Sequence, residues 1–385
     1  MREEGAVRWD IFCSVVDNYG DIGVTWRLAR QLAAEHGLAV RLWVDEPAAF
    51  ARLCPQADTA LAQQWLAGVE VCRWTADFPS VAAADVVIEA FACTLPARYV
   101  EAMAARAEPP LWLNLEYLSA EDWVPGCHGL PSPQPGGLQK FFFFPGFVPG
   151  TGGLLREAGL LERRRQFQAG AGARQAFLAG LGVPPVAGAW LISLFAYENP
   201  ALGPWLDALA QGTQPVQLLV PRGRIEGDLY RWLGVAAAQA GDCWQRGSLH
   251  LHLLPFVSQD DYDRLLWSCD FNAVRGEDSF VRAQWAGRPL LWHIYQQEEG
   301  AHWDKLDAFL ALYRAALPPL AGEALTAWWH AWNGRGDMAQ AWQALCGQIE
   351  ALAAHAQDWC REQASRPDLA TALVQFHRNW LSCAA

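Results

Sequence analysis

WDIFCSVV at Trp9–Val16, DNYGDIG at Asp17–Gly23 and VTWRLARQLAAEH at Val24–His36 follow one another without a break near the start of the sequence. The first segment is apolar and rich in β-formers, the second is a turn with two glycines, and the third carries apolar residues at helical spacing. Together they predict a buried strand, a loop and a helix. This succession is typical of the first unit of a parallel α/β fold.

The same alternation continues along the chain. Short apolar runs predict strands, and helical patterns separate several of them, so the sequence favours parallel, doubly wound sheets. The expected strands of a first block are Ala39–Val44, Val69–Trp74, Val86–Phe91 and Leu111–Leu115, and those of a second block are Trp190–Phe195, Val216–Val220, Leu249–Leu254, Phe271–Val274 and Leu290–Tyr295.

A region rich in Pro and Gly, between Pro125 and Gly153, ends the first block, and Lys305–Leu381 is almost wholly helical in pattern. A length of 385 residues fits two domains. We expect an N-terminal Rossmann-like domain at 1–170 and a C-terminal Rossmann-like domain at 171–385, with its last helices free to pack back on the first domain. Two such domains would face one another across a cleft that binds ligand.

Composition and charge disfavour several classes of protein. Hydrophobic residues make up 52% and charged residues 18%, which is typical of a folded globular protein. Lys and Arg total 29 against 41 Asp and Glu, a net charge of −12 that disfavours nucleic acid as the main partner. No apolar run reaches the length of a membrane span and Met1–Asp10 lacks signal-peptide features, so we expect a cytoplasmic protein without membrane attachment.

The ten cysteines contain no C-x-x-C pair and the nine histidines no H-E-x-x-H. This spacing favours reduced, mostly buried thiols and predicts no protein-bound metal. The 21 Trp residues are numerous, and for any one of them packing is the favoured interpretation over sugar stacking.

The loop after the first strand carries Gly20 and Gly23 but not the full glycine fingerprint of a dinucleotide site. Asp17 and Asp21 flank this turn, and two carboxylates there would repel a phosphate. They suit a group that is cationic or gives up a proton. An equally good explanation is local, with Asp21 capping the next helix and Asp17 forming an Asx turn.

RGEDSFVRAQ at Arg275–Gln284 follows directly on a predicted strand. Gly276 suits a turn, and Asp278 or Ser279 can cap a new helix whose N-terminus would hold a diphosphate, with Arg275 as a charge partner. Capping alone explains Asp278 and Ser279 nearly as well. Glu277 beside an anion site suggests a second task, such as binding sugar hydroxyls.

Two aromatic stretches, FAYEN at Phe195–Asn199 and LPFVSQ at Leu254–Gln259, come at predicted strand ends. A ring there can stack on a pyrimidine, and the hydroxyl of Tyr197 can donate to a phosphate. Residue type alone favours core positions for Phe195 and Phe256.

Taken together, these stretches resemble the bacterial protein-arginine rhamnosyltransferases that modify elongation factor P (the EarP family). The similarity covers nearly the whole chain and rests on these and further segments: Trp9–Leu32, NLEYLSAEDWV at Asn114–Val124, FFFFPGF at Phe141–Phe147, LFAYEN at Leu194–Asn199, LPFVSQDDYD at Leu254–Asp263 and RGEDSFVRAQWAG at Arg275–Gly287.

The resemblance implies a GT-B type glycosyltransferase that moves L-rhamnose from dTDP-β-L-rhamnose to an arginine of elongation factor P with inversion. It needs no cofactor or metal. Asp21 would be the general base and Asp17 its acidic companion, with Glu277 an essential acidic residue near the donor. The implied donor-binding residues are Gly20, Phe195, Tyr197, Phe256, Gln259, Arg275, Gly276, Asp278 and Ser279. Asn114–Val124 would belong to the acceptor-facing surface. The resemblance also implies that the domain at 1–170 binds the acceptor and that the domain at 171–385 binds the nucleotide sugar.

Two alternatives stay open at this point. One is a nucleotide-sugar transferase or epimerase of the same architecture that acts on a small molecule. The other is a non-catalytic interaction protein that uses the crevice and the aromatic strip Phe141–Phe147 as a docking surface.

Overall fold

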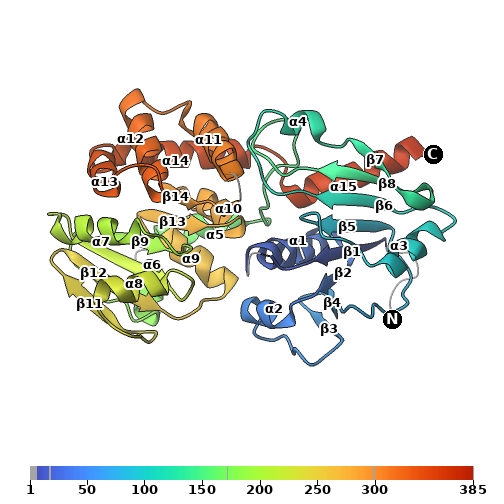
Figure 1. The fold of residues 1–385 in the computed structure, drawn as a ribbon, viewed down its shortest axis with the longest axis horizontal. Helices are drawn as coiled ribbons and strands as arrows, with labels where there is room; N and C mark the ends of the chain where they lie inside the picture. Colours follow the sequence, from blue (N-terminus) through green and yellow to red (C-terminus); the bar gives the residue numbers. More distant parts are fainter. Residues whose placement is uncertain (1–6, 17–18, 171, 298–299, 385) are drawn as a thin grey trace. The chain divides into compact units, whose positions relative to one another are not determined.

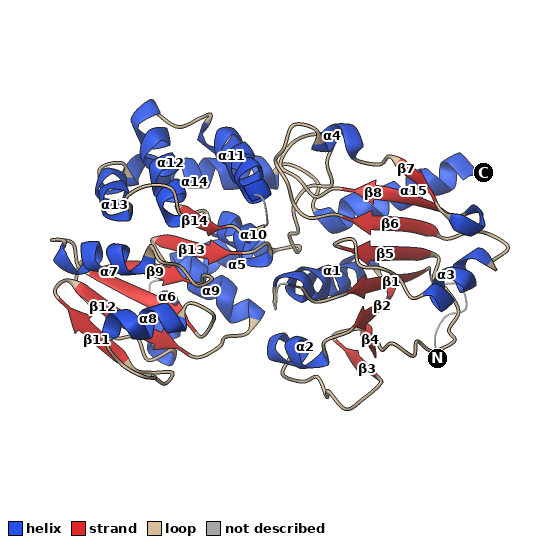
Figure 2. Cartoon of the chain, viewed as in Figure 1, coloured by secondary structure: helices blue, strands red, loops and turns tan. Residues whose placement is uncertain are grey.

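The computed structural model describes residues 7–16, 19–170, 172–297 and 300–384. The chain divides into two compact units, of which the first comprises Met1–Ala158 with Gln363–Ala385 and the second Gly159–Glu362. Each unit contains its own sheet with helices on both faces (Figures 1 and 2).

The first unit has an eight-stranded sheet in the order β3-β4-β2-β1-β5-β6-β8-β7, in which only the two edge strands run antiparallel to their neighbours. The six central strands are therefore parallel. Its elements are β1 (Arg8–Cys13), α1 (Gly20–His36), β2 (Ala39–Val44), α2 (Pro47–Leu53), β3 (Gln63–Leu66), β4 (Val69–Arg73), β5 (Val86–Ala90), α3 (Ala97–Ala104), β6 (Leu111–Leu115), α4 (Val124–Cys127), β7 (Pro131–Pro133), the 3₁₀ turn η1 (Pro135–Gly137), β8 (Gln139–Phe143) and α15 (Leu369–Ala384).

Alternate side chains of β1 enter two different cores, as the two-residue period of a strand requires. Ile11 and Cys13 lie in a cluster with α1, α2 and α15, to which Leu373 of the last helix contributes. Phe12 lies on the opposite face with Tyr99 of α3. Both faces of the sheet are thereby buried, which is why its central strands have nearly continuous apolar sequences.

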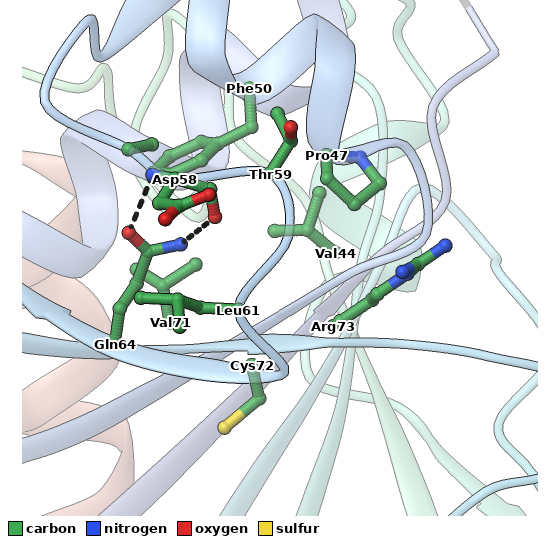
Figure 3. A pocket seen from close by; sticks show the side chains of 11 residues that line it. Val44, Pro47, Phe50, Asp58, Thr59, Leu61, Gln64, Val71, Cys72 and Arg73 are labelled. Atoms are coloured by element: carbon green, nitrogen blue, oxygen red, sulfur yellow. Dashed lines mark hydrogen bonds between the residues drawn. The ribbon is translucent and has the colours of Figure 1, made fainter.

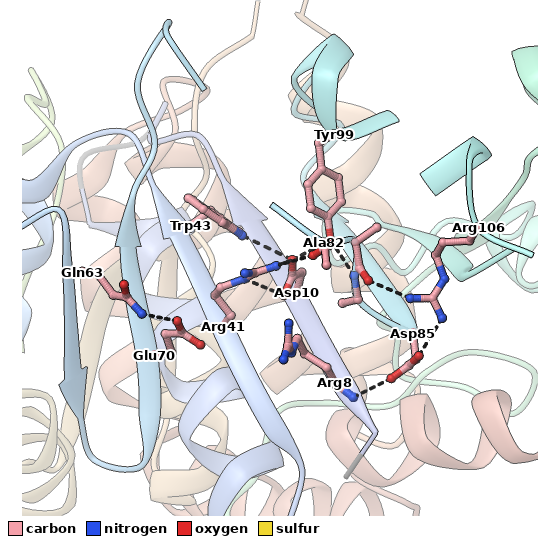
Figure 4. A network of polar contacts seen from close by, with 12 residues as sticks. Arg8, Asp10, Arg41, Trp43, Gln63, Glu70, Ala82, Asp85, Tyr99 and Arg106 are labelled. Atoms are coloured by element: carbon pink, nitrogen blue, oxygen red, sulfur yellow. Dashed lines mark hydrogen bonds and ion pairs between the residues drawn. The ribbon is translucent and has the colours of Figure 1, made fainter. Parts of the chain in front are cut away.

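A buried polar network crosses this second core (Figure 4). Asp10 on β1 is fully buried and accepts hydrogen bonds from the guanidinium of Arg41 on β2, from the hydroxyl of Tyr99 and from the indole of Trp43. Burial raises the pKa of Asp10, while its bonds with Arg41 oppose that rise. Removal of one partner of such a pair typically costs about 3–5 kcal/mol.

The sequence predicted the strands β1, β2, β4, β5 and β6, but the Pro/Gly-rich region contains more order than expected. Its phenylalanine run forms β8, a sixth parallel strand that pairs Phe141 with Leu113 of β6. Phe143, Phe144 and Phe147 are buried. The proposal of an exposed aromatic docking strip at Phe141–Phe147 is therefore wrong, because this segment completes the core.

The second unit has a six-stranded sheet in the order β11-β12-β10-β9-β13-β14, parallel except for the edge strand β11. All five strands predicted for this block are present. The elements are α5 (Leu160–Ala169), α6 (Ala173–Gly180), β9 (Trp190–Leu194), α7 (Leu202–Gln211), β10 (Val216–Pro221), α8 (Glu226–Leu233), β11 (Cys243–Arg246), β12 (Leu249–Leu254), α9 (Gln259–Ser268), β13 (Phe271–Arg275), α10 (Asp278–Ala286), β14 (Leu290–His293), α11 (Ala301–Arg314), α12 (Pro319–Trp332), α13 (Met338–Cys346) and α14 (Ile349–Ala364).

Tryptophans build one of its cores. Trp205 of α7 packs edge to face against Trp328 and Trp332 of α12 and against Trp342 of α13, with ring centroids 5.2–6.1 Å apart. All four are buried. Packing is therefore the role of these indoles, as their residue type suggested.

The helix α5 lies on the N-terminal side of the boundary expected at residue 170, yet it packs with the second unit. Arg164 of α5 donates to the carbonyl oxygen of Trp285 at 2.7 Å, and Phe167 contacts Trp267 of α9. These contacts place the change of unit before α5. The two Rossmann-like α/β domains and the helical C-terminal segment confirm the predicted fold class.

No helix among the described residues is long and apolar enough to cross a membrane.

Candidate active site

Each sheet has one point at which its strand order reverses, and ligands of open α/β sheets bind beside the carboxyl ends of the strands there. In the first unit this point lies between β1 and β5, and in the second between β9 and β13. The predicted residues follow these strands: Asp21 follows β1, Phe195 follows β9, and Arg275–Ser279 ends β13 and opens α10.

Asp21 is the second residue of α1 and its side chain turns back toward the end of β1. Its Oδ2 accepts the backbone N–H of Val16 at 2.8 Å, and its Oδ1 accepts the hydroxyl of Tyr117 at 3.4 Å. The N-cap position belongs to Tyr19, so the capping interpretation of Asp21 is wrong. Asp17 lies outside the described residues.

Asp21 is 3% exposed, but its contacts come from residues at the rim of the sheet. Val16 is 69% exposed and Tyr117 is half-buried. The carboxylate therefore lies directly beneath the surface of the first unit, at the carboxyl edge of its sheet. Gly20, the first residue of α1, is half-buried beside it.

The loop that leads to Asp21 is held by a residue that the sequence analysis did not single out. Asp45, which follows β2, accepts the hydroxyl of Ser14 at 2.6 Å and the backbone N–H of Val15 at 3.0 Å. A lone Asp after a strand carries no motif, and only the pairing of β1 with β2 brings it to this loop.

In the second unit, three predicted residues converge at the ends of β9 and β13. The guanidinium of Arg275 lies over the rings of Phe195 and Tyr197, 4.6 and 4.7 Å from their centroids. Arg275 and Tyr197 are buried and Phe195 is half-buried. A planar cation in contact with two aromatic rings is the arrangement of a cation–π site.

A second cation lies beside the same ring. Arg224 is 5.4 Å from the Tyr197 centroid and forms an ion pair with Glu198 at 2.9 Å. Burial raises the pKa of Glu198, but the hydrogen bond and charge of Arg224 outweigh it and lower the pKa overall. Arg275 and Arg224 thus place two guanidinium groups next to aromatic surface, and that of Arg224 is paired with Glu198.

The turn RGEDS leads from β13 into α10. Gly276 has φ of 59°, a conformation that glycine adopts without strain, and Glu277 occupies the N-cap position without a side-chain capping bond. The hydroxyl of Ser279 donates to the Arg275 carbonyl and accepts the Arg275 N–H at 3.2 Å. Ser279 therefore closes the turn and does not cap α10. Glu277 and Asp278 are half-buried at the helix start.

Phe256 and Gln259 follow β12, which is separated from β9 by β10. Phe256 is half-buried and Gln259, the first residue of α9, is buried. Tyr262 of α9 packs its ring edge to face on the ring of Phe195, with the two centroids 5.7 Å apart. The structure therefore places both residues on the same sheet edge as Arg275.

A buried ion pair fixes the two helices of this edge to each other. Arg282 of α10 donates to both carboxylate oxygens of Asp263 on α9, at 2.8 and 2.6 Å, and both residues are buried. A guanidinium that bonds a carboxylate through two parallel hydrogen bonds fixes the relative orientation of the two groups as well as their distance. The start of α10 is thus held in a fixed position relative to α9.

His293 at the end of β14 is a further neighbour that the sequence analysis did not identify. Its ring packs edge to face on Tyr197 at 5.2 Å, and its buried Nδ1 has no hydrogen-bond partner. Burial, and after it the charge of Arg275, lower the pKa of His293 to about 3. The imidazole is consequently neutral at physiological pH.

Other features of the described residues do not form a competing site. No group of three or more His, Cys, Asp or Glu side chains gathers there as a metal site requires. A hollow between α2 and β4 has a volume of about 10 Å³, room for a water molecule, and the backbone of Asp58 and the amide of Gln64 bond across it (Figure 3). A larger hollow of about 560 Å³ beside α15 contains none of the predicted site residues.

Comparisons with known proteins show the family to which the chain belongs. Residues 9–378 match the profile of the family described as Elongation-Factor P (EF-P) rhamnosyltransferase EarP. Two similar curated proteins are named protein-arginine rhamnosyltransferase. The one from Pseudomonas putida is 68% identical, the one from Pseudomonas aeruginosa 63%, and each alignment covers 97% of this chain and 99% of the relative.

Solved structures give the same result. The structure titled "Structural basis for EarP-mediated arginine glycosylation of translation elongation factor EF-P" is 51% identical, has a TM-score of 0.70, and is matched over 97% of this chain and 99% of its own. The spinosyn rhamnosyltransferase SpnG, 14% identical with a TM-score of 0.53 over 96% of this chain and 100% of its own, shares the fold. The chain therefore belongs to the EarP family of elongation factor P rhamnosyltransferases.

Proposed function

We propose that this enzyme transfers L-rhamnose from dTDP-β-L-rhamnose to an arginine side chain of elongation factor P, with inversion at the anomeric carbon and Asp21 as the general base. Such an enzyme would work in the cytoplasm, where translation factors act. The observation that carries the proposal is the carboxylate of Asp21 at the carboxyl edge of the first sheet, held through one oxygen by the Val16 N–H.

The acceptor defines what the first domain must supply. A guanidinium has a pKa of roughly 12.5–13.8 and a delocalised lone pair, so it is a poor nucleophile until a carboxylate orients it and accepts its proton. Asp21 is suited to both tasks, and Asp17 is its proposed acidic companion. The excess of negative charge on the whole chain also suits a cationic acceptor group.

The donor defines what the second domain must supply. A nucleoside diphosphate needs rings for its base and cationic or N–H groups for its phosphates. The proposed residues are Phe195, Tyr197, Phe256 and Gln259 around the nucleotide, with Arg275, Gly276, Asp278 and Ser279 at the diphosphate. Gly20 is proposed to allow close approach at the start of α1, and Glu277 to hold the sugar.

The reaction balances without a cofactor or metal. One guanidinium N–H proton moves to Asp21 as the nitrogen forms a bond to the anomeric carbon. The bond from that carbon to the phosphate oxygen breaks on the opposite face, and its electron pair leaves on dTDP. Positive charge at the diphosphate stabilises the developing negative charge, and single displacement produces inversion.

Asp21→Asn tests the assignment of the base. The variant keeps nearly the same volume, so we expect dTDP-rhamnose binding by calorimetry to be unchanged and rhamnosylation of elongation factor P by mass spectrometry to be abolished. Asp77→Asn, at a fully exposed side chain of the same domain, is the matched control. Normal turnover by Asp21→Asn would refute the base assignment, and an unmodified elongation factor P with the wild-type enzyme would favour a small-molecule acceptor.

A further inference from the structure

A pair of aromatic rings lies next to the Asp21 carboxylate. Tyr117 follows β6 and Phe91 follows β5, and the two rings stack with centroids 4.7 Å apart and an interplanar angle of 22°. The hydroxyl of Tyr117 donates to Oδ1 of Asp21. Because β1, β5 and β6 are consecutive parallel strands, the three residues share one edge of the sheet.

Each oxygen of Asp21 has a contact of its own. Oδ2 accepts a backbone N–H at the ordinary distance of 2.8 Å, whereas the Tyr117 hydroxyl is 3.4 Å from Oδ1, longer than a normal O–H···O bond. Oδ1 is thus the oxygen that faces the tyrosine hydroxyl.

The backbone beneath the ring pair is strained. Phe91 and Ala92 have φ of 56° and 53°, a region that costs residues with a Cβ atom of order 1–2 kcal/mol each. The N–H of Phe91 donates to Leu115 at 2.7 Å, and the Asn114 side chain accepts the N–H of Ala92 at 3.3 Å. The end of β6 thus fixes a conformation that brings Phe91 under Tyr117.

A planar cation suits this arrangement better than a compact one. Phe91 stacks on Tyr117, and the tyrosine is only half-buried, so part of its side chain is accessible. A guanidinium stacks on an aromatic ring while its N–H groups point in the ring plane toward a carboxylate, which an ammonium group cannot do.

We propose that Tyr117 is a positioning residue that orients Oδ1 of Asp21 to receive the proton, and that the Tyr117–Phe91 pair favours arginine as the acceptor by stacking on its guanidinium. This inference rests on the proposed function of Asp21. It assigns separate tasks to the two parts of one side chain, the hydroxyl acting on the base and the ring acting on the acceptor.

Other titratable groups surround Asp21 and would share its pH response. Cys13 ends β1, and burial, with a smaller contribution from the charge of Asp21, raises the pKa of its thiol well above the ordinary value. Asp45 follows β2 at the same loop, and Glu116 precedes Tyr117 in the chain. All of these remain in place in a Tyr117 variant, so a difference between variants reports on the hydroxyl.

Tyr117→Phe and Tyr117→Leu separate the two tasks. A hydroxyl that donates to a carboxylate favours the charged form, so its removal in Tyr117→Phe should move the acid limb of kcat/KM upward by about 0.5–1 pH unit. The plateau at high pH should stay near the wild-type value, because the ring is kept. Tyr117→Leu should show the same shift and also a plateau that is about 3- to 30-fold lower.

Tyr230→Phe and Tyr230→Leu on α8 are the matched controls, since this hydroxyl also bonds a carboxylate, that of Glu226. The KM for dTDP-rhamnose should be unchanged in all four variants. A wild-type pH profile in Tyr117→Phe would overturn the role of the hydroxyl, and equal plateaus in Tyr117→Phe and Tyr117→Leu would overturn the role of the ring. If Asp21→Asn were fully active, the proposed function itself would fail, whatever the tyrosine variants did.

Discussion

Gly153 lies so close to the carbonyl oxygen of Pro367 that a Cβ atom at Gly153 would be 2.3 Å from it. The two residues belong to the segments by which the chain leaves and re-enters the first unit. Further bonds join these segments: Leu369 donates its N–H to Leu154 at 3.0 Å, and Arg156 donates to Ala364 at 2.6 Å. Close backbone contact is what places a glycine here.

Gly153→Ala should destabilise the first unit strongly. The residue has φ of 68°, and the added methyl group would also overlap a backbone oxygen that cannot rotate away. Gly37→Ala is the matched control, because Gly37 has φ of 65° but no atom within 4 Å of an added Cβ. We expect a loss of about 1 kcal/mol in the control and at least about 3 kcal/mol in Gly153→Ala, measured by urea unfolding. Equal losses would contradict the contact.

Arg275→Lys should weaken nucleotide binding. Lysine keeps the charge but not the planar group that lies over Phe195 and Tyr197. Calorimetry with dTDP should show an affinity about tenfold lower, since the cation–π contacts and the proposed bidentate contact with the diphosphate would be lost together. Arg335→Lys, at a guanidinium 3.6 Å from the Trp303 ring, provides a control outside the predicted site. Unchanged affinity in Arg275→Lys would remove Arg275 from the donor site.

Trp328→Leu should lower the free energy of unfolding by about 2–4 kcal/mol, because the indole is fully buried against Trp205 and leaves a cavity. Trp65→Leu is the control at a side chain that is 51% exposed, where the change should stay within about 0.5 kcal/mol. Denaturant unfolding followed by circular dichroism measures both. Similar losses in the two variants would argue against the tryptophan core.

His293 should make the fold sensitive to acid. The folded pKa is about 3 whereas an unfolded histidine titrates near about 6.5, so between these values the unfolded state binds a proton that the folded state does not. Stability is therefore full above about pH 6.5 and falls as the pH drops toward 3. In His293→Phe the decrease in melting temperature between pH 7 and pH 4.5 should be smaller than in the wild type or in His250→Phe. Identical decreases in all three would contradict the assignment.

The sequence predicted the fold well where local patterns are strong. The run from Trp9 to His36 combines a β-rich segment, two glycines and a helical period, and the structure contains β1 and α1 there. The sequence did not predict β8. Four consecutive phenylalanines beside Pro and Gly show neither the polar–apolar alternation of an edge strand nor the flanking residues that are typical of a buried strand. Only pairing with β6 defines that strand.

The sequence could propose site residues but not the contacts between them. Motifs pointed to Asp21 and Arg275–Ser279, while capping and turn formation explained several of these residues equally well from sequence alone. The hydrogen bond from Tyr117 to Asp21 joins residues 96 positions apart. Such a contact depends on strand order, which no local pattern encodes, and the same holds for Asp45 and His293.

The first unit is assembled from both ends of the chain, with Leu369, Leu373 and Val374 of α15 completing the core that also contains α1. During synthesis this core cannot close until the last segment, from Gln363 onward, has left the ribosome. The second unit, by contrast, is one continuous stretch whose every residue emerges earlier. The first unit is thus the last to mature, and a truncated product would carry a finished second unit beside an unfinished first one.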